Sequence, residues 1–309
     1  MENVLRTLIW DEQVSLTLVD ATEIVNEAIR LHGLSRPAAL VLGKTLSVMT
    51  FMSACLKEET GEVSVSLKGN GRGGKLSVSG NYALRIRGYI DCPQAVTEGG
   101  DEEAECLGSE GSLTIIRDDG YRRPIVGARA LNSSGSVERA FEEYYRISEQ
   151  LPTHIAASIG FTPEGTCAYA GTVVLQPLPF ADEETLKKLP ARKRLEEIAA
   201  SVKALGLEKA AEIYFSAKSA GLNLRKAEYK CNCSKEYLSG VLVSLGKDQL
   251  ATFSARTEIK VHCHYCNKRL SLLRKRDVEK MFRKSAQGVG RAAMGRIRSA
   301  NETTEGHEN

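Results

Sequence analysis

KCNCSK, residues 230–235, and HCHYCNK, residues 262–268, hold four of the eight cysteines of the 309-residue chain in two tight pairs. One residue separates the cysteines of the first pair, two separate those of the second, and 29 residues lie between Cys233 and Cys263. Domains of fewer than about 40 residues normally need a metal ion or disulfides, because they bury too little apolar surface. The spacing therefore predicts a small module, residues 230–271, that is held together by its sulfurs. We call it the cysteine module.

The redox state of the cellular compartment determines whether a metal ion or disulfides would stabilise the cysteine module. The N-terminal stretch MENVLRTLIWDEQVSL has no basic start followed by an apolar core, so we expect a cytoplasmic rather than a secreted protein. Cytosolic thiols are kept reduced, which argues against permanent disulfides. Four thiolates around one tetrahedral Zn²⁺ remain as the expected staple. The predicted ligands are Cys231, Cys233, Cys263 and Cys266.

Three other interpretations of these cysteines are possible. They could be unligated core residues, which two tight pairs flanked by lysine and arginine disfavour. Cys263 and Cys266 could be a thioredoxin-like redox pair, but that motif needs a βαβ setting that the preceding residues do not indicate. His262 or His264 could replace one thiol as a ligand, although four cysteines already complete a tetrahedron.

The same site is predicted to respond to oxidants. Zinc keeps its sulfur ligands as thiolates, the form that oxidants attack. A bond between Cys231 and Cys233 would close a small strained ring, and strained disulfides are easily reduced again. Zinc binding is worth about 10–16 kcal/mol in zinc-finger peptides, whereas small domains are stable by about 5–15 kcal/mol. Oxidation is therefore expected to unfold the module, which makes it a switch as well as a staple.

The remainder of the chain predicts an α+β fold. An apolar fraction of 42% and a net charge of +3 are those of an ordinary globular protein, without a strongly charged partner for the chain as a whole. Asp20 and Glu23 resemble a capping box at the start of a helix. Alternating segments and Gly-rich turns then predict short strands, and the core α+β domain is placed at residues 1–178. The strand-like segments are 63–67, 76–78, 84–90, 113–116, 155–159 and 171–175.

Two stretches need a choice between a functional and a structural interpretation. Residues Pro37–Leu56 have the length of a membrane span, but Lys44 and several small polar residues favour a buried helix that starts after Ser35. GNGRGG, residues 69–74, matches the spacing of the dinucleotide-binding pattern G-x-G-x-x-G, but its sequence context does not fit that pattern. That fingerprint must open a helix, and the residues after it alternate like a strand, so we interpret it as a hairpin turn.

Residues 179–229 form a helical segment that we call the linker. It is rich in Ala, Leu, Glu and Lys, Pro190 divides it, and its apolar residues recur at helical spacing. An amphipathic helix of this kind must bury its apolar stripe on a neighbour or remain marginal. We therefore expect the linker to dock on the first domain rather than fold alone.

With these features, the chain resembles the redox-regulated heat-shock holdase family, heat shock protein thirty-three or the 33 kDa chaperonin family. The cysteine layout is the sharpest match, and the likeness extends over nearly the whole chain. The other matching segments are ATEIVNEA (21–28), RGYI (87–90), DDGYRRPIVG (118–127), YYRISEQLPT (144–153) and AYAGTVVLQPLP (168–179).

The resemblance implies a binding protein and not an enzyme. In the reduced, zinc-bound state such a protein is an inactive monomer. Oxidation would form the disulfides Cys231–Cys233 and Cys263–Cys266, release zinc and undock the linker. The exposed apolar surface, with Leu195, Ile198 and Val202 as candidate client contacts, would bind unfolding proteins without ATP, and oxidised protomers would form homodimers. No ATP-binding motif is present, in agreement with this.

The last segment, residues 272–309, supports a different hypothesis. Residues 268–298 carry eleven Lys or Arg against two acidic residues, and we expect a basic, partly disordered tail. The tail is the basis of an alternative function, a zinc-containing protein that binds nucleic acid or another anionic surface. A disulfide oxidoreductase is a further alternative. The scattered cysteines, Cys55, Cys92, Cys106 and Cys167, have no ligand spacing and are expected to be ordinary buried or half-buried residues.

Overall fold

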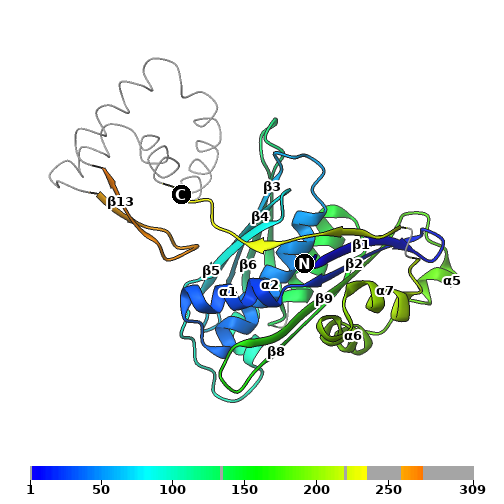
Figure 1. Ribbon diagram of the computed structural model, residues 1–309, viewed down its shortest axis with the longest axis horizontal. Helices are drawn as coiled ribbons and strands as arrows, with labels where there is room; N and C mark the ends of the chain where they lie inside the picture. The colour runs from blue at the N-terminus through cyan, green and yellow to red at the C-terminus, as the bar shows by residue number, and fades with distance from the viewer. Residues whose placement is uncertain (1, 133–134, 219–220, 235–258, 274–309) are drawn as a thin grey trace. The chain divides into compact units, whose positions relative to one another are not determined.

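The computed structural model describes residues 2–132, 135–218, 221–234 and 259–273 (Figure 1). The chain divides into two compact units, Met1–Lys230 and Cys231–Asn309. The first unit is an α+β domain, which confirms the predicted fold class. The linker residues that the structure describes belong to this first unit.

A five-stranded antiparallel sheet forms the centre of the first unit. Its strand order is β10-β1-β2-β9-β8. The strands are β1 (Val4–Ile9), β2 (Val14–Asp20), β8 (His154–Phe161), β9 (Cys167–Pro177) and β10 (Asn223–Arg225). Along β9, Val173 and Leu175 belong to one buried cluster while Ala170 and Val174 belong to another. Because successive residues of a strand point to opposite faces, this sheet is covered on both sides.

A six-stranded sheet lies on the other side of the central helices. Its order is β11-β5-β4-β3-β6-β7, and all neighbours are antiparallel except the β11–β5 pair. The strands are β3 (Glu62–Gly69), β4 (Lys75–Asn81), β5 (Arg85–Ile90), β6 (Glu110–Asp118), β7 (Ile125–Asn132) and β11 (Glu228–Tyr229). In β3, buried Val63, Val65 and Leu67 alternate with half-buried serines, so one face of this sheet points to the core.

The helices complete a layered arrangement. They are α1 (Thr22–His32), α2 (Arg36–Ala54), α3 (Glu102–Leu107), α4 (Val137–Tyr144), the π-helical turn η1 (Tyr145–Glu149), α5 (Glu183–Leu186), α6 (Arg192–Leu205) and α7 (Leu207–Phe215). α2 contacts strands of both sheets and lies between them, whereas α6 and α7 cover the opposite face of the five-stranded sheet (Figure 1). The order of layers is six-stranded sheet, α1 and α2, five-stranded sheet, then the linker helices.

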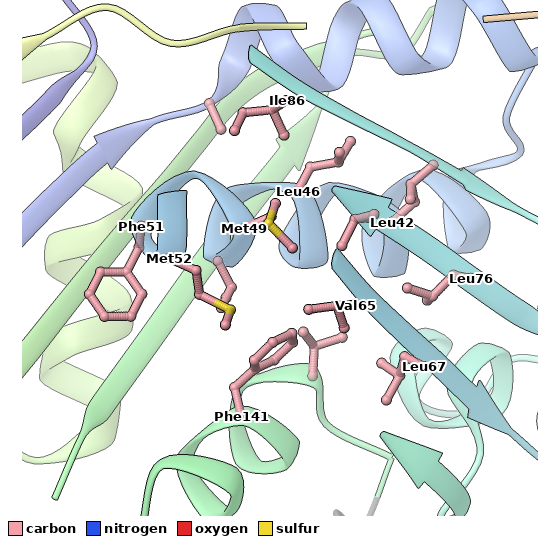
Figure 2. Close-up of a cluster of buried hydrophobic side chains, with 14 of the residues drawn as sticks. Leu42, Leu46, Met49, Phe51, Met52, Val65, Leu67, Leu76, Ile86 and Phe141 are labelled. Carbon is pink, nitrogen blue, oxygen red and sulfur yellow. The ribbon is translucent and has the colours of Figure 1, made fainter. Parts of the chain in front are cut away.

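Helix α2 is the core of the first unit. Figure 2 shows Leu42, Leu46 and Met49 of this helix among side chains of β3, β4 and β5, and Phe141 of α4 closes the cluster. The helix is long and apolar enough to cross a membrane, but 89% of its most apolar window is buried inside the fold. The prediction of a buried helix over Pro37–Leu56 is therefore confirmed, and the helix begins at Arg36 after Ser35.

The GNGRGG stretch is the turn between β3 and β4, as predicted. The two strands pair antiparallel up to Lys68 and Lys75, so no helix follows the glycines. A Cβ atom on Gly69 would lie 1.7 Å from the carbonyl oxygen of Leu107, and one on Gly71 would lie 2.5 Å from that of Cys106. These glycines let the turn approach the end of α3 closely, which explains them without a nucleotide.

The linker helices are docked through a second apolar core. This cluster joins the outer face of the five-stranded sheet to α6 and α7, and its members are Leu5, Ile9, Val14, Leu16, Leu18, Ala156, Val173, Leu175, Leu195, Ile198, Ala199, Val202, Leu207, Ala210, Ala211 and Phe215. The three candidate client contacts, Leu195, Ile198 and Val202, are only 3%, 2% and 0% exposed. Their side chains can therefore meet another protein only when α6 leaves the sheet.

Two local contacts hold α6 against the sheet and the core. A Cβ atom on Gly171 of β9 would lie 1.8 Å from the carbonyl oxygen of Ala199, so only glycine permits this approach of helix and strand. At the start of α6, Arg192 Nη2 lies 2.5 Å from Glu142 Oε2 of α4, and Glu142 Oε1 accepts a hydrogen bond from Ile155 N–H at 2.8 Å. The contact between Gly171 and Ala199 and the ion pair between Arg192 and Glu142 would both be lost if α6 left the sheet.

A buried charge cluster joins α2, α3 and α4. Lys44 Nζ lies 2.5 Å from Glu103 Oε2 and 2.8 Å from Glu138 Oε1, and all three side chains are largely buried. Burial and the charge of Glu138 raise the pKa of Glu103 to about 7. Burial opposes the charged form of Glu138 as well, but Lys44 outweighs it and lowers the pKa of that carboxyl. Above neutral pH the cluster therefore holds two buried negative charges against one positive charge.

We expect the Glu103→Gln variant to be more stable than the wild type above pH 7. The folded-state pKa of Glu103 lies above its unfolded value of 4.5, so the folded state favours the protonated carboxyl. The stability that this carboxyl contributes to the fold is therefore present below pH 4.5 and is lost as the pH rises through 7. The thermal midpoint of the variant at pH 8 should be about 2–5 °C higher than that of the wild type, with little difference at pH 5.

The matched control is Glu102→Gln, because Glu102 is the half-buried neighbour of Glu103 and pairs with the exposed Arg36 outside the charge cluster. Calorimetry of the three proteins at pH 5 and pH 8 measures the effect. Equal midpoints for the wild type and Glu103→Gln at both pH values would contradict the assignment of a raised pKa to Glu103.

Candidate metal centre

The second unit brings the four cysteines of the two motifs together. Cys231 and Cys233 lie on the segment that follows β11 in the chain, and Cys263 and Cys266 lie on the turn between β12 (Ile259–His262) and β13 (Arg269–Leu273). The turn is closed by two backbone hydrogen bonds: Cys263 N–H donates to Lys268 C=O at 3.0 Å, and Asn267 N–H donates to Cys263 C=O at 2.8 Å. The short C-x-x-C spacing thus places both sulfurs of this pair on one tight turn.

The geometry of the four sulfurs fits a tetrahedral metal ion. All four Sγ atoms lie within 4.8 Å of one another. Two sulfur–sulfur contacts cross between the motifs, at 3.6 Å from Cys231 Sγ to Cys263 Sγ and at 3.2 Å from Cys233 Sγ to Cys266 Sγ. A tetrahedron with metal–sulfur bonds of about 2.3 Å has sulfur–sulfur edges of about 3.8 Å. Only a small adjustment separates the observed cluster from that arrangement.

The chemistry of the donors also favours a cation. All eight cysteines are free thiols, so no disulfide holds the cluster. Burial and the neighbouring thiols raise the pKa of Cys233 to about 12, and the hydrogen bond with Cys231 together with burial raises the pKa of Cys263. A divalent ion among the four sulfurs would supply the positive charge that stabilises them as thiolates. The arrangement can therefore bind one metal ion.

The two histidines of the second motif do not join the cluster. The rings of His262 and His264 are exposed and pack edge to face, with centroids 5.7 Å apart. The group of potential ligands among the described residues consists of the four cysteines.

The four scattered cysteines lie elsewhere, in the first unit. Cys106 and Cys167 are buried and Cys55 is half-buried, as predicted, but Cys92 is exposed, so the prediction is wrong for that residue. Burial is the main cause that raises the pKa of Cys106 to about 11 and that of Cys167 to about 12. These two thiols are therefore poor nucleophiles, because the thiolate is the reactive form.

Sequence reasoning missed the residues that position the linker. Gly171 was assigned to a strand but not recognised as a contact point, although an interior glycine in a strand often marks close backbone approach. Nothing in the sequence indicates the ion pair between Glu142 and Arg192, because 50 positions separate the two residues.

The predicted basic tail cannot be compared with the structure, because residues 274–309 lie outside the described part of the chain. The prediction that this tail is basic and partly disordered remains a prediction, as does any role in binding nucleic acid.

The fold and the cysteine cluster together define an α+β protein with a small module whose four cysteines could hold a metal ion. Comparison with known proteins agrees with that class. A model of the Hsp33 protein family matches residues 2–272. The 33 kDa chaperonin of Bacillus mycoides is 31% identical over 274 residues, which cover 86% of this chain and 94% of the relative. The 33 kDa chaperonin of Bacillus cereus is 30% identical with the same coverage.

A solved structure shows the same fold. The crystal structure of the 33 kDa chaperonin of Thermotoga maritima superposes with a TM-score of 0.76 at 23% identity, covering 93% of this chain and 99% of that one. On the family match and the curated relatives, the chain belongs to the Hsp33 family. The resemblance seen in the sequence is thus confirmed. The relatives are named as chaperonins and not as enzymes, which agrees with the prediction that the chain is not an enzyme.

Proposed function

We propose that this chain is a redox-regulated, ATP-independent holdase whose four-cysteine cluster binds one zinc ion in the resting, reduced state. The observation that carries the proposal is the cluster itself, with four sulfurs within 4.8 Å of one another in a chaperone of the Hsp33 family. Zinc, when bound, would hold the sulfurs as thiolates and stabilise a module that is too small to fold by itself.

The cysteines would carry the oxidative step. In each pair, two thiolates give up two electrons to one molecule of peroxide, a disulfide forms and the peroxide leaves as two hydroxide ions. The proposed pairs are Cys231–Cys233 and Cys263–Cys266. The sulfurs of a disulfide are poor metal ligands, so the oxidised module would lose both zinc and its fold.

The linker would respond because it is joined to the module by short strands. β11 pairs with β5 through two residues and β10 pairs with β1 through three, and Cys231 follows β11 by two positions. Such short edge pairings contribute little stability alone. Unfolding of the module would let these strands fray, and α6 and α7 would then lose one of their anchors on the five-stranded sheet.

Undocking would uncover apolar surface on both partners. The outer face of the sheet would present Leu16, Leu18 and Val173, and α6 would present Leu195, Ile198 and Val202. Contiguous apolar patches of this kind bind other proteins. We propose that unfolding clients bind there without ATP, that oxidised protomers associate as homodimers, and that the reduced chain is a monomer in the cytoplasm.

The two alternative functions have weaker support. A disulfide oxidoreductase disagrees with the naming of the relatives as chaperonins. Nucleic-acid binding through the tail depends on residues outside the described part of the chain, and it predicts activity that requires zinc to be retained.

The proposal is tested by comparing the reduced and the peroxide-treated chain as suppressors of aggregation of a heat-denatured client, without ATP. We expect protection only from the oxidised chain, and peptide mapping should find disulfides within each cysteine pair. Equal protection by both forms would refute redox control. Disulfides that join the two motifs, or that involve Cys55 or Cys92, would refute the proposed pairing.

A further inference from the structure

The turn between β1 and β2 has an unusual backbone. Trp10, Asp11 and Glu12 all adopt left-handed conformations, with φ of 51°, 54° and 61°. A positive φ is uncommon in residues other than glycine, and a bulky residue such as tryptophan is strained there. No other described part of the chain has two such residues in succession.

The loop has a common alternative that lacks this strain. β1 and β2 pair as far as Ile9 and Val14, so four residues connect the strands. Four-residue hairpin loops are most often built around a type I turn, whose two central residues have negative φ. The length of the loop therefore does not require three left-handed residues, and contacts elsewhere must hold them.

The last residue of the turn is bound to the start of the linker. Gln13 Oε1 accepts a hydrogen bond from Asp182 N–H at 2.7 Å, and Gln13 Nε2 donates to Asp182 Oδ2 at 3.1 Å. The Gln13 carbonyl accepts a further bond from Leu178 N–H at 2.8 Å. Asp182 is also the N-cap of α5, where its Oδ1 accepts from Thr185 N–H at 2.7 Å. The turn is thus tied to an ordered part of the linker.

The first residue of the turn is packed against the last docked helix of the linker. The rings of Trp10 and Phe215 of α7 have centroids 6.3 Å apart and are tilted by 52°. Trp10 packs on the second apolar core, of which the buried Phe215 is a member. The two ends of the turn therefore contact α5 and α7, which lie beside it in Figure 1.

The middle of the turn lies in solvent. Asp11 and Glu12 are exposed, whereas Trp10 and Gln13 are half-buried. Strained backbone persists only where the surrounding structure over-determines it, and such strain is found in switch regions. The ring that faces Trp10 belongs to the linker, and the groups that bind Gln13 from outside the hairpin belong to the linker or the residue just before it. The left-handed conformation is therefore coupled to the docked state.

We propose that the β1–β2 turn is a strained clamp: docking of the linker holds Trp10–Glu12 in left-handed conformations, and the turn relaxes when the linker leaves. The strain makes the docked state less stable than its contacts alone would make it. Loss of the anchors at β10 and β11 is then sufficient to release α6 and α7. The inference rests on the proposed function for the role of this release, but it concerns an equilibrium of the reduced chain.

The test compares Glu12→Gly with Glu12→Ala in the reduced, zinc-loaded full-length chain. Both changes remove the same exposed carboxylate, but only glycine adopts a positive φ without strain. Glycine should therefore stabilise the docked state selectively. We expect the backbone amides of α6 and α7 to exchange hydrogen about five-fold more slowly in Glu12→Gly than in Glu12→Ala.

The matched control is the same pair of changes at Gln150. This residue is also left-handed and exposed, with φ of 52°, but it ends the η1 turn and its N–H donates to Tyr145 C=O. Relief of strain there should not favour docking, so Gln150→Gly and Gln150→Ala should show equal exchange in α6 and α7.

Two results would overturn the inference. Equal exchange of the linker helices in Glu12→Gly and Glu12→Ala would show that the turn keeps its strain after undocking. Exchange of α6 and α7 no faster than that of α2 would show that the linker leaves only when the whole domain unfolds.

The only tryptophan of the chain gives a second measurement. After peroxide treatment, the emission of Trp10 should shift to longer wavelength as the turn leaves Phe215, and more slowly in Glu12→Gly than in Glu12→Ala. An equal rate of this shift in the two variants would also contradict the clamp. Hydrogen exchange of the reduced chain involves no oxidant, so failure of redox control leaves the clamp standing, and failure of the clamp leaves the redox proposal standing.

Discussion

Replacing Gly171 by valine is expected to give a chain that suppresses client aggregation without any oxidant. The new Cβ atom would lie 1.8 Å from the carbonyl oxygen of Ala199 and 3.2 Å from Val202 Cβ, so α6 cannot keep its position on β9. Overpacking against backbone costs about 3 kcal/mol, which shifts the equilibrium between docked and undocked linker by about 100-fold. The reduced, zinc-loaded variant should therefore show much of the protection that the wild type gains on oxidation.

The matched control is Thr172→Val, at the next position of the same strand. Thr172 belongs to the opposite face, and its buried Oγ1 has no hydrogen-bond partner among the described residues, so valine should be tolerated there. Limited proteolysis should cut residues 192–215 in Gly171→Val and not in Thr172→Val. A Gly171→Val chain with an undocked linker but no protection would show that undocking is insufficient. A docked and inactive variant would contradict the geometry of the contact.

Replacing Cys266 by serine is expected to remove the metal from the reduced chain. Cys266 is buried in the cluster, and its sulfur lies 3.2 Å from that of Cys233. Serine offers a neutral hydroxyl in place of a thiolate, so zinc affinity should fall by more than the 10–100-fold that loss of an outer-shell partner costs. Chelator competition measures the affinity, and zinc content after dialysis gives the stoichiometry.

Cys92→Ser serves as the control for this variant, because Cys92 is an exposed thiol outside the cluster. It should retain about one zinc per chain with unchanged affinity, as expected for a closed four-cysteine site. If Cys266→Ser holds zinc as tightly as the wild type, then another residue completes the site and the four-sulfur assignment is wrong.

The cysteine cluster was accessible to sequence reasoning because its ligands occur as two short motifs. Local spacing already predicts a tight turn for Cys263 and Cys266, and the small size of the module requires a staple. The structure adds the distances between the motifs, which the sequence does not contain.

Burial on one or both faces changes the pattern from which a strand is predicted, as β3 and β2 illustrate. β3 alternates buried and half-buried residues and was recognised as a strand. β2, in contrast, buries Leu16, Thr17, Leu18 and Val19 in succession, because α2 covers one face and α6 the other. The alternation that identifies a strand is lost when both faces are covered, and no strand was predicted there.

The predicted start of helix α1 was wrong by one residue. The sequence predicted a capping box from Asp20 and Glu23, but the helix begins at Thr22 and its N-cap position is Ala21. Asp20 Oδ1 instead accepts hydrogen bonds from the backbone and the hydroxyl of Thr22. Long-range polar contacts were beyond the sequence altogether, as with Lys44, whose partner Glu138 lies 94 positions away and reaches it only through the fold.

In the proposed mechanism, one cluster holds a metal at rest and forms disulfides under oxidation, and this change activates the chaperone. The most direct test follows zinc release, free thiols and suppression of client aggregation together in one sample of reduced, zinc-loaded chain treated with peroxide at elevated temperature. We expect about one zinc to leave as four thiols disappear, with protection appearing in the same period. If zinc stays bound, or leaves without protection, the cysteines are only a structural staple and the account is contradicted.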